Sequence, residues 1–197
     1  MLMIDRYMPE YQFGEYHEIV IRAPREEVFR AVCELRGEDI PFMRILFAIR
    51  LLPSFVLGKR KWEGRRLAPA ESPAFLKSMV HYGFLVLEER PAEELVLGVA
   101  GEFWKLAGNA PFKLDSPERF LNFHNPKAVK SVMQFLLRDQ PSGTTLLCTE
   151  TRVSAVDSAA RLKFGLYWAC IYPFSALIRR MMLKSIKKIA ERRVRHD

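Results

Sequence analysis

The alternation of hydrophobic and polar positions near the N-terminus predicts a strand followed at once by a helix. In residues 15–22, EYHEIVIR, His17, Ile19 and Ile21 share one face, and β-branched residues are frequent. In residues 23–35, APREEVFRAVCEL, apolar residues recur at helical spacing after a proline. The first 14 residues are interpreted as an N-terminal extension of the folded domain.

Two further helical segments are predicted before the pattern changes. Residues 38–58, EDIPFMRILFAIRLLPSFVLG, are apolar on almost every side, and we expect a helix or broken helix at the mouth of a cavity. Contact of this segment with a membrane surface is the lesser alternative. A short helix is expected in residues 72–83, because Ser72 is a capping residue and Gly83 is a stop signal.

The middle and late parts of the chain have the pattern of antiparallel strands. Residues 84–91 and 95–104 are predicted strands joined by the turn AEE. The strand-like run 119–126, RFLNFHNP, leads into two long strands joined by the turn QPSG. The residues expected to face the core from these two strands are Val129, Ser131, Met133, Phe135 and Leu137 on the first, and Leu147, Thr149, Thr151 and Val153 on the second.

A long helix is predicted from Asp157 or Ser158, as capping residue, to the end of the chain. Residues 164–178 carry no charge and reach about 22 Å as a helix, which is shorter than the ~30 Å hydrocarbon core of a bilayer. Pro173 should kink this helix near residues 169–172. We expect the apolar first half to lean over a cavity and the basic second half to run out along the surface as a solvated end.

Composition favours one globular domain, and the basic net charge favours anionic partners, although solvated basic faces are common. The chain has 197 residues, 49% of them hydrophobic, and a formal net charge of +8. If the basic residues bind a partner, the expected partner is an anionic membrane surface. The contact would be made by the basic end of the last helix and by Lys59, Arg60, Lys61, Arg65 and Arg66. Nucleic acid is disfavoured, because no stacking platform accompanies these residues.

The cysteines and the first residues indicate a cytoplasmic protein. Cys33, Cys148 and Cys170 are odd in number and far apart, and each has apolar neighbours, which is typical of reduced thiols. The first 18 residues include acidic side chains and have no basic start followed by an apolar run, so they do not resemble a secretory signal.

Three stretches mark the order of elements: APREEVFRAV after the first strand, ELVLGVAGEFW in the middle, and TETRVSAVDSAARLKFGLYWAC at the start of the final part. This order and these stretches resemble the START-like superfamily, also called SRPBCC. That group includes polyketide cyclases, coenzyme-Q-binding proteins and lipid-transfer domains, and the nearest resemblance is to bacterial members of unknown function. It implies one domain over residues 1–197, of the α+β class, with a helix-grip fold. In this fold a curved antiparallel sheet wraps around a long C-terminal helix, two helical segments follow the first strand, and an apolar cavity lies between sheet and helix.

Few residues suggest catalysis. The sequence contains no phosphate-binding loop, no nucleophile elbow and no paired metal ligands, so we expect neither a cofactor nor a metal ion. The weak catalytic candidates are Glu102, Glu150 and His81. For Glu102 a position on the solvent face is favoured over a desolvated general base. For Glu150 and Arg152, structural ion pairs with charges on neighbouring strands are favoured over a catalytic pair.

The expected function is to bind an apolar or amphipathic small molecule, such as a lipid, a quinone or a polyketide-like compound, as a carrier or a sensor. Aromatic residues with polar tips on the last helix suit such a ligand. A cyclase- or dehydratase-like enzyme acting on an aromatic or polyketide-like substrate and a peripheral membrane protein are the alternatives. The predicted ligand-binding residues are Phe103, Met133, Phe135, Thr149, Thr151, Tyr167, Trp168, Ile171, Tyr172 and Ser175.

Overall fold

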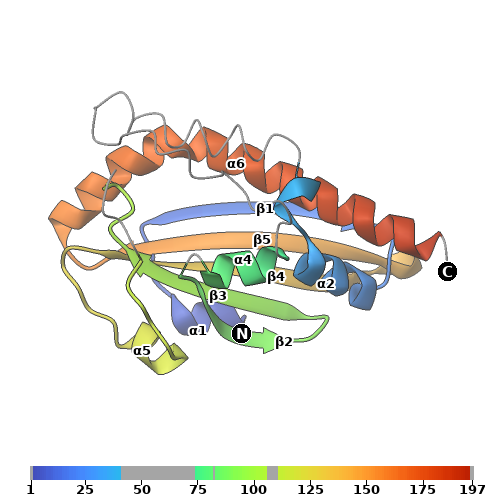
Figure 1. Cartoon of the computed structure of the whole chain (residues 1–197), viewed down its shortest axis with the longest axis horizontal. Coiled ribbons are helices and arrows are strands. Elements are labelled where there is room, and N and C mark those ends of the chain that lie inside the picture. The colour runs from blue at the N-terminus through green and yellow to red at the C-terminus, as the bar shows by residue number, and fades with distance from the viewer. Residues whose placement is uncertain (1, 41–73, 82, 106–110, 196–197) are drawn as a thin grey trace.

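One antiparallel sheet and one long helix dominate the computed structural model, which describes residues 2–40, 74–81, 83–105 and 111–195. The strands are β1 (Phe13–Ile21), β2 (Leu85–Arg90), β3 (Glu94–Gly101), β4 (Val129–Gln140) and β5 (Thr144–Ala155). The helices are α1 (Met3–Tyr7), α2 (Arg25–Glu34), α4 (Phe75–His81), α5 (Pro117–Leu121) and α6 (Ser158–Val194). Figure 1 shows α6 lying along one face of the sheet, which confirms the α+β class and the helix-grip arrangement.

The strand order places the first and the last strand of the chain side by side. The sheet runs β1-β5-β4-β3-β2, so the first strand of the chain pairs with the last. The predicted turn between β4 and β5 is present over Pro141–Gly143, with Ser142 and Gly143 both at positive φ, and Gln140 lies opposite Thr144. Gly143 has a φ of +67°, a conformation that glycine adopts at little cost. The second helical segment predicted at 38–58 lies mostly outside the described residues, whereas α4 confirms the short helix expected at 72–83.

The main core lies between the sheet, α2 and the second half of α6. The buried residues that α6 contributes are Met182, Leu183, Ile186 and Ala190, and they pack on Val28 and Val32 of α2 and on the sheet. The expectation of a solvated basic end was therefore wrong for one side of this helix. Residues three or four apart share a helix face, so the inner side of residues 182–190 is core while the outer side keeps the basic residues.

α6 begins as predicted and remains one helix through its proline. The Asp157 carboxylate accepts hydrogen bonds from the backbone N–H groups of Ala159 at 2.8 Å and Ala160 at 3.3 Å, which identifies Asp157 as the capping residue. Figure 1 shows that α6 arches over the sheet, and Pro173 is on its exposed side. A proline removes one backbone donor and favours such bending. Among the described residues, no helix is both long enough and apolar enough to cross a membrane.

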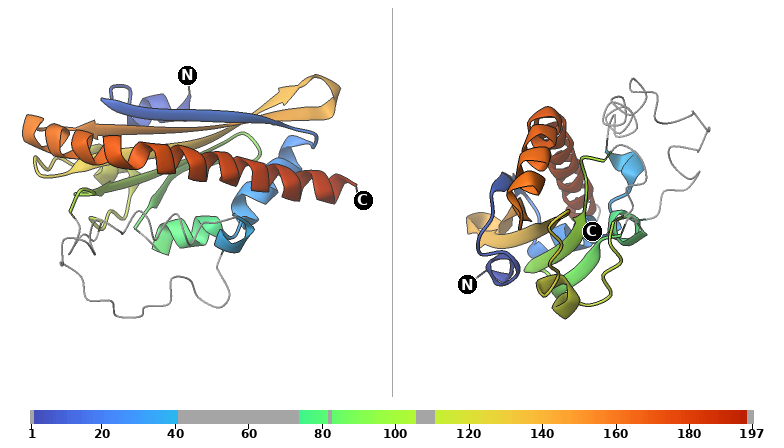
Figure 2. Two further views of the ribbon diagram at one scale, coloured as in Figure 1. Left: turned by 90° about the horizontal axis from the view of Figure 1, so that it is seen from above. Right: turned by 90° about the vertical axis from the view of Figure 1, so that its left-hand side faces the viewer.

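Two short helices cover the opposite face of the sheet, as Figure 2 shows. α1 and α5 bury Ile4, Tyr7 and Phe120 against Val96 and Val132 of the sheet. The strand-like interpretation of residues 119–126 was wrong at its beginning, because residues up to Leu121 belong to α5. The Ser116 side chain accepts a hydrogen bond from the Arg119 backbone N–H at 3.2 Å, and Pro117 occupies the first turn, so local capping outweighs the β-like composition.

Candidate functional site

A buried polar cluster lies on the face of the sheet that α6 covers. Glu15 and His17 of β1 lie opposite Thr151 and Thr149 of β5 in the antiparallel register. Because side chains alternate between the two faces of a strand, all four point to the same side. Glu15 is 4% exposed, and its carboxylate oxygen Oε1 lies 2.8 Å from Nε2 of His17.

α6 completes this polar cluster with two residues one turn apart. Ser175 donates a hydrogen bond from Oγ to Oε2 of Glu15 at 2.7 Å. Arg179 donates from one guanidinium nitrogen to Oγ1 of Thr149 at 2.8 Å and from another to Oγ1 of Thr151. The guanidinium therefore bridges two threonines of β5, and the serine holds the carboxylate of β1.

The electrostatics of the cluster centre on Arg179. Burial of its guanidinium lowers the pKa of Arg179, although part of the side chain reaches solvent, and the charge of Glu15 opposes this shift. The two hydrogen bonds to threonine hydroxyls satisfy some of its five N–H groups without neutralising its charge. Because hydroxyl groups do not neutralise a desolvated cation, a further hydrogen-bond acceptor or an anion next to the Arg179 guanidinium would stabilise it.

Aromatic side chains gather beside the polar cluster, toward the start of α6. The ring centroids of Phe13 and Phe164 are 5.0 Å apart, those of Phe164 and Trp168 are 5.6 Å apart, and those of Trp168 and Tyr172 are 5.8 Å apart. Phe103 and Tyr167 pack against the same cluster of buried residues. The site thus has a polar part and an aromatic part next to each other.

The stretch of α6 that roofs the site is loosely packed. No residue from 165 to 181 is fully buried, although most are apolar, whereas the helix on either side of this stretch contributes Phe164 and Met182 to the buried clusters. At the β1 edge a hollow of about 230 Å³ is lined by His17, Glu18, Ile19, Arg180, Leu183 and Lys184. This roof therefore leaves apolar surface that packing within the described residues does not cover.

Most of the predicted ligand-binding residues lie at this site. Met133, Phe135, Thr149 and Thr151 are buried on the strands that face α6, and Ser175 belongs to the polar cluster. Phe103, Tyr167 and Trp168 are in the aromatic part, Ile171 is half-buried on α6, and Tyr172 is 42% exposed at the flank of the helix.

The three catalytic candidates lie elsewhere. Glu102 follows β3 and forms an ion pair with Lys105. His81 is exposed at the end of α4. Glu150 is on the opposite face of β5, where Oε1 accepts a hydrogen bond from Nε of Arg152 at 2.6 Å. None of the three joins the polar cluster.

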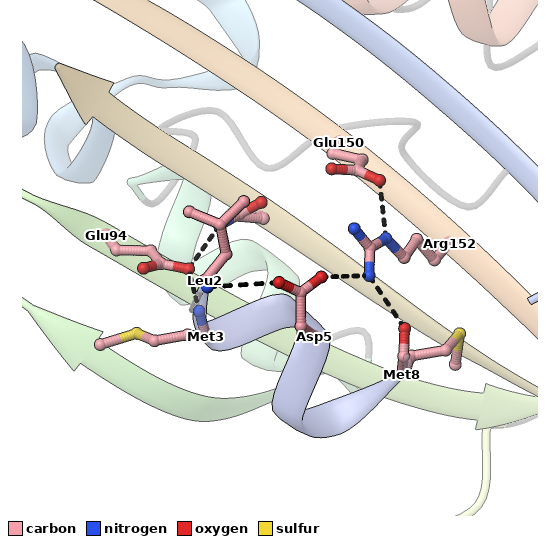
Figure 3. A network of polar contacts seen from close by, with 8 residues as sticks. Leu2, Met3, Asp5, Met8, Glu94, Glu150 and Arg152 are labelled. Carbon is pink, nitrogen blue, oxygen red and sulfur yellow. Dashed lines mark hydrogen bonds and ion pairs between the residues drawn. The ribbon is translucent and has the colours of Figure 1, made fainter. Parts of the chain in front are cut away.

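The Glu150–Arg152 pair is part of a network that holds α1 on the sheet, shown in Figure 3. Arg152 also donates to the Asp5 carboxylate at 2.8 Å and to the backbone oxygen of Met8 at 3.0 Å. Nearby, the buried Glu94 carboxylate accepts a hydrogen bond from the Met3 backbone N–H at 2.7 Å. These contacts bind the start of the chain to the back of the sheet, which is a structural role.

Reasoning from the sequence missed Glu15, His17 and Arg179 as members of the site. A signal for His17 was present, since it shares a face with Ile19 and Ile21 in the strand pattern. Arg179 follows Ser175 by four residues, which places both on one side of a helix. Among the described residues, no group of three or more histidine, cysteine or acidic side chains is arranged to hold a metal ion.

These features define the protein as a helix-grip domain with a buried polar cluster beneath its long helix. No protein-family model matches the chain. No curated protein matches it in sequence. The basic residues of the predicted membrane contact at 59–66 lie outside the described residues.

Solved structures resemble the chain at low similarity. Protein MLL2253 of Mesorhizobium loti is 15% identical with a TM-score of 0.40, covering 91% of this chain and 98% of that chain. The Zhui aromatase/cyclase of Streptomyces sp. R1128 is 13% identical with a TM-score of 0.32, covering 92% and 95%. Hypothetical protein jhp0584 of Helicobacter pylori is 12% identical with a TM-score of 0.36, covering 92% and 93%. The helix-grip arrangement rests on the strand order and α6 of this chain.

Proposed function

We propose that the protein binds an amphipathic small molecule between α6 and the sheet, as a carrier or sensor. The polar group of the ligand lies at Arg179 and its neighbours, and the apolar part lies along the aromatic residues of α6. The observation that carries this proposal is the Arg179 guanidinium, which reaches the floor of the site. Within the described part of the chain, its hydrogen bonds go only to two threonine hydroxyls there. The START-like resemblance of the sequence supports the same class of function.

The composition of the site restricts the ligand. The hydroxyls of Thr149 and Thr151 and the guanidinium of Arg179 offer O–H and N–H donors, so a carboxylate or carbonyl oxygen suits this end. Phe164 and Trp168 offer flat apolar surface for rings or alkyl chains. A fatty acid, a quinone or a polyketide-like acid has both parts, and a highly charged nucleotide does not match the aromatic part.

Two related fluorescent probes test the proposal. 1-Anilinonaphthalene-8-sulfonate carries an anion on an aromatic body, and N-phenyl-1-naphthylamine has the same body without the anion. Both should bind to the native protein and should be displaced by a fatty acid. Arg179→Met keeps an unbranched apolar side chain but removes the charge, so the sulfonate probe should bind about ten- to hundredfold more weakly while the neutral probe changes little.

Controls separate the internal site from the outside of α6. Leu166→Glu combined with Leu177→Glu alters the exposed side of the helix and should leave the affinity of both probes unchanged. Thermal unfolding of each variant shows whether the fold is intact, because partly unfolded protein also binds such dyes. Absence of binding by either probe, or equal weakening of both by Arg179→Met, would refute the proposal.

The contact between His17 and Glu15 favours a second candidate, an enzyme that removes a proton next to a carbonyl group of an aromatic or polyketide-like substrate. A carboxylate 2.8 Å from an imidazole nitrogen is a suitable arrangement for a general base. The test is deuterium uptake from D₂O by a ligand that copurifies from the host, measured by mass spectrometry. Deuterium uptake by the ligand should require the protein. It should be lost with the His17→Gln variant and retained with the His81→Gln variant. Uptake equal to that in buffer alone removes this candidate.

A further inference from the structure

The outward side of α6 carries an exposed apolar stripe, which we define as Leu162, Leu166, Cys170, Pro173 and Leu177. Leu162 is 67% exposed, Leu166 is 66% exposed and Leu177 is 46% exposed, and Cys170 and Pro173 are exposed as well. Successive members are three or four residues apart, so they form one line along the helix. Exposing a group of leucine side chains to water in this way costs free energy, and such a group indicates an interaction surface.

Basic residues continue the same line and border its beginning. Arg180, Lys184 and Lys188 are exposed on the outward side beyond Leu177, and Arg161 and Lys163 flank the start of the stripe. From Ser158 to Ala190, α6 contains no acidic residue. Arg180, Lys184 and Lys188 form no ion pair with any residue in the described part of the chain.

We propose that the apolar stripe docks this protein on the surface of an anionic lipid bilayer, with α6 lying flat on it. The leucines enter the boundary between headgroups and acyl chains, and Arg180, Lys184 and Lys188 contact lipid phosphates. Figure 1 shows that the outward side of α6 is the convex side of its arch, so the middle of the stripe can approach a flat surface before the ends do.

The charges favour a bilayer over other occupants. A second copy docking through the same surface about a two-fold axis brings two basic helices together, and α6 itself supplies no acidic partner between Ser158 and Ala190. A nucleic acid offers anions, but leucines give it no stacking surface. An anionic bilayer satisfies both the leucines and the cations. This inference does not depend on the internal ligand site, because the stripe and the polar cluster lie on opposite sides of α6.

The first experiment is flotation of the whole protein with vesicles of phosphatidylglycerol and phosphatidylcholine, compared with vesicles of phosphatidylcholine alone. Binding is expected only to the anionic vesicles. It should weaken as salt rises from 0.1 to 1 M, because the screening length falls from about 10 Å to about 3 Å. Leu166→Glu with Leu177→Glu should weaken binding at least tenfold, and removal of each basic charge at Arg180 or Lys184 by glutamine should weaken it about fivefold.

The matched control is Val20→Glu. Val20 is 48% exposed on β1, on the side of the sheet away from α6, so its replacement adds a negative charge to an exposed apolar position outside the stripe. It should lower vesicle binding far less than the paired leucine replacements do. Circular dichroism of each variant confirms that the fold is retained.

Cys170 provides a direct readout of contact. Burial raises the pKa of Cys33 to about 11, and burial also raises the pKa of Cys148, so the exposed Cys170 should react first with a thiol-directed fluorophore near neutral pH. The emission of that fluorophore should shift to the blue with anionic vesicles.

Four results would overturn the docking proposal. The first is absence of flotation with anionic vesicles at low salt, and the second is equal flotation with both vesicle types. The third is unchanged flotation of the paired leucine variant. The fourth is a dimer in solution that the paired leucine replacements convert to a monomer, with vesicles binding neither the dimer nor the monomer. The first three remove the role of lipid charge or of the stripe, and the fourth assigns the stripe to self-association. None of them alters the binding of the fluorescent probes to the internal site, so the two proposals fail separately.

Discussion

Ser175 on α6 and Glu15 on β1 are 160 residues apart in the chain, and Oγ of Ser175 donates a 2.7 Å hydrogen bond to Oε2 of Glu15. The other carboxylate oxygen lies 2.8 Å from His17. Glu15 is almost completely buried, so these two contacts replace much of the hydration that the carboxylate loses on folding. The pair joins the edge of the sheet to the loosely packed part of α6.

Removal of the serine hydroxyl should destabilise the protein. Ser175→Ala leaves one oxygen of the buried Glu15 carboxylate without its donor, which should cost about 1–3 kcal/mol of the free energy of unfolding. Urea titration followed by circular dichroism measures this change. Ser154→Ala, at a half-buried position near the end of β5, is the control and should change the free energy by about 0.5 kcal/mol or less. Equal stability of the two variants would contradict the role assigned to Ser175.

The replacement Arg152→Met should loosen α1. Burial lowers the pKa of Arg152, but its hydrogen bonds to Glu150 and Asp5 outweigh burial and raise the pKa overall. The two carboxylates therefore stabilise the charged guanidinium. Without it, Glu150 and Asp5 lose their common cation, and Met8 loses a donor to its backbone oxygen. Hydrogen exchange of the backbone amides of α1 should become at least tenfold faster, while the amides of α6 from 182 to 190 keep their protection.

An exposed ion pair serves as the control for Arg152. Arg119 and Asp115 are 2.9 Å apart with both side chains more than half exposed, so Arg119→Met should leave the exchange of α1 unchanged. Unaltered exchange of α1 in Arg152→Met would show that apolar packing alone holds this helix.

Two glycines should respond to alanine in opposite directions. A Cβ at Gly98 of β3 would lie 2.7 Å from Cδ1 of Leu87 and 2.8 Å from Cε2 of Phe120, so Gly98→Ala should destabilise the protein by about 1–3 kcal/mol. A Cβ at Gly165 of α6 would meet Phe13 at 3.4 Å, an ordinary contact, and alanine favours the helix by about 0.5–1 kcal/mol. The midpoint of urea unfolding should fall for the first variant and rise for the second. The same sign for both would contradict the described packing.

Local patterns in the sequence were sufficient for most elements. The alternation in residues 129–140 and 144–155 predicted the inward faces of β4 and β5, because the side-chain period of a strand is two wherever the strand lies. A cap at Asp157 or Ser158 was predicted because a capping side chain acts on the next few N–H groups, and the structure identifies Asp157. Ser116 and Pro117 carried the same kind of signal for α5, but the apolar residues that follow were interpreted as a strand.

The site itself depends on contacts between distant parts of the chain. His17 and Ser175 could be placed on the inner faces of their elements from periodicity alone. The pairing of β1 with β5, which sets Glu15 opposite Thr151, depends on the order of strands in the sheet. The contacts of Arg179 with Thr149 and Thr151 depend in addition on the rotation of α6 about its axis.

The sequence by itself determined most of the elements, the cap of the last helix, the turn between the two long strands and the apolar run in the last helix, because these features follow from interactions between residues close together in the chain. Only the tertiary structure decided that the basic second half of α6 carries the core on its inner side. It also decided that Glu15, Ser175 and Arg179 share one buried site, and that Leu162, Leu166 and Leu177 point outward. Periodicity defines the faces of a helix, but which face is buried is set by the apolar surface that the rest of the chain presents to it.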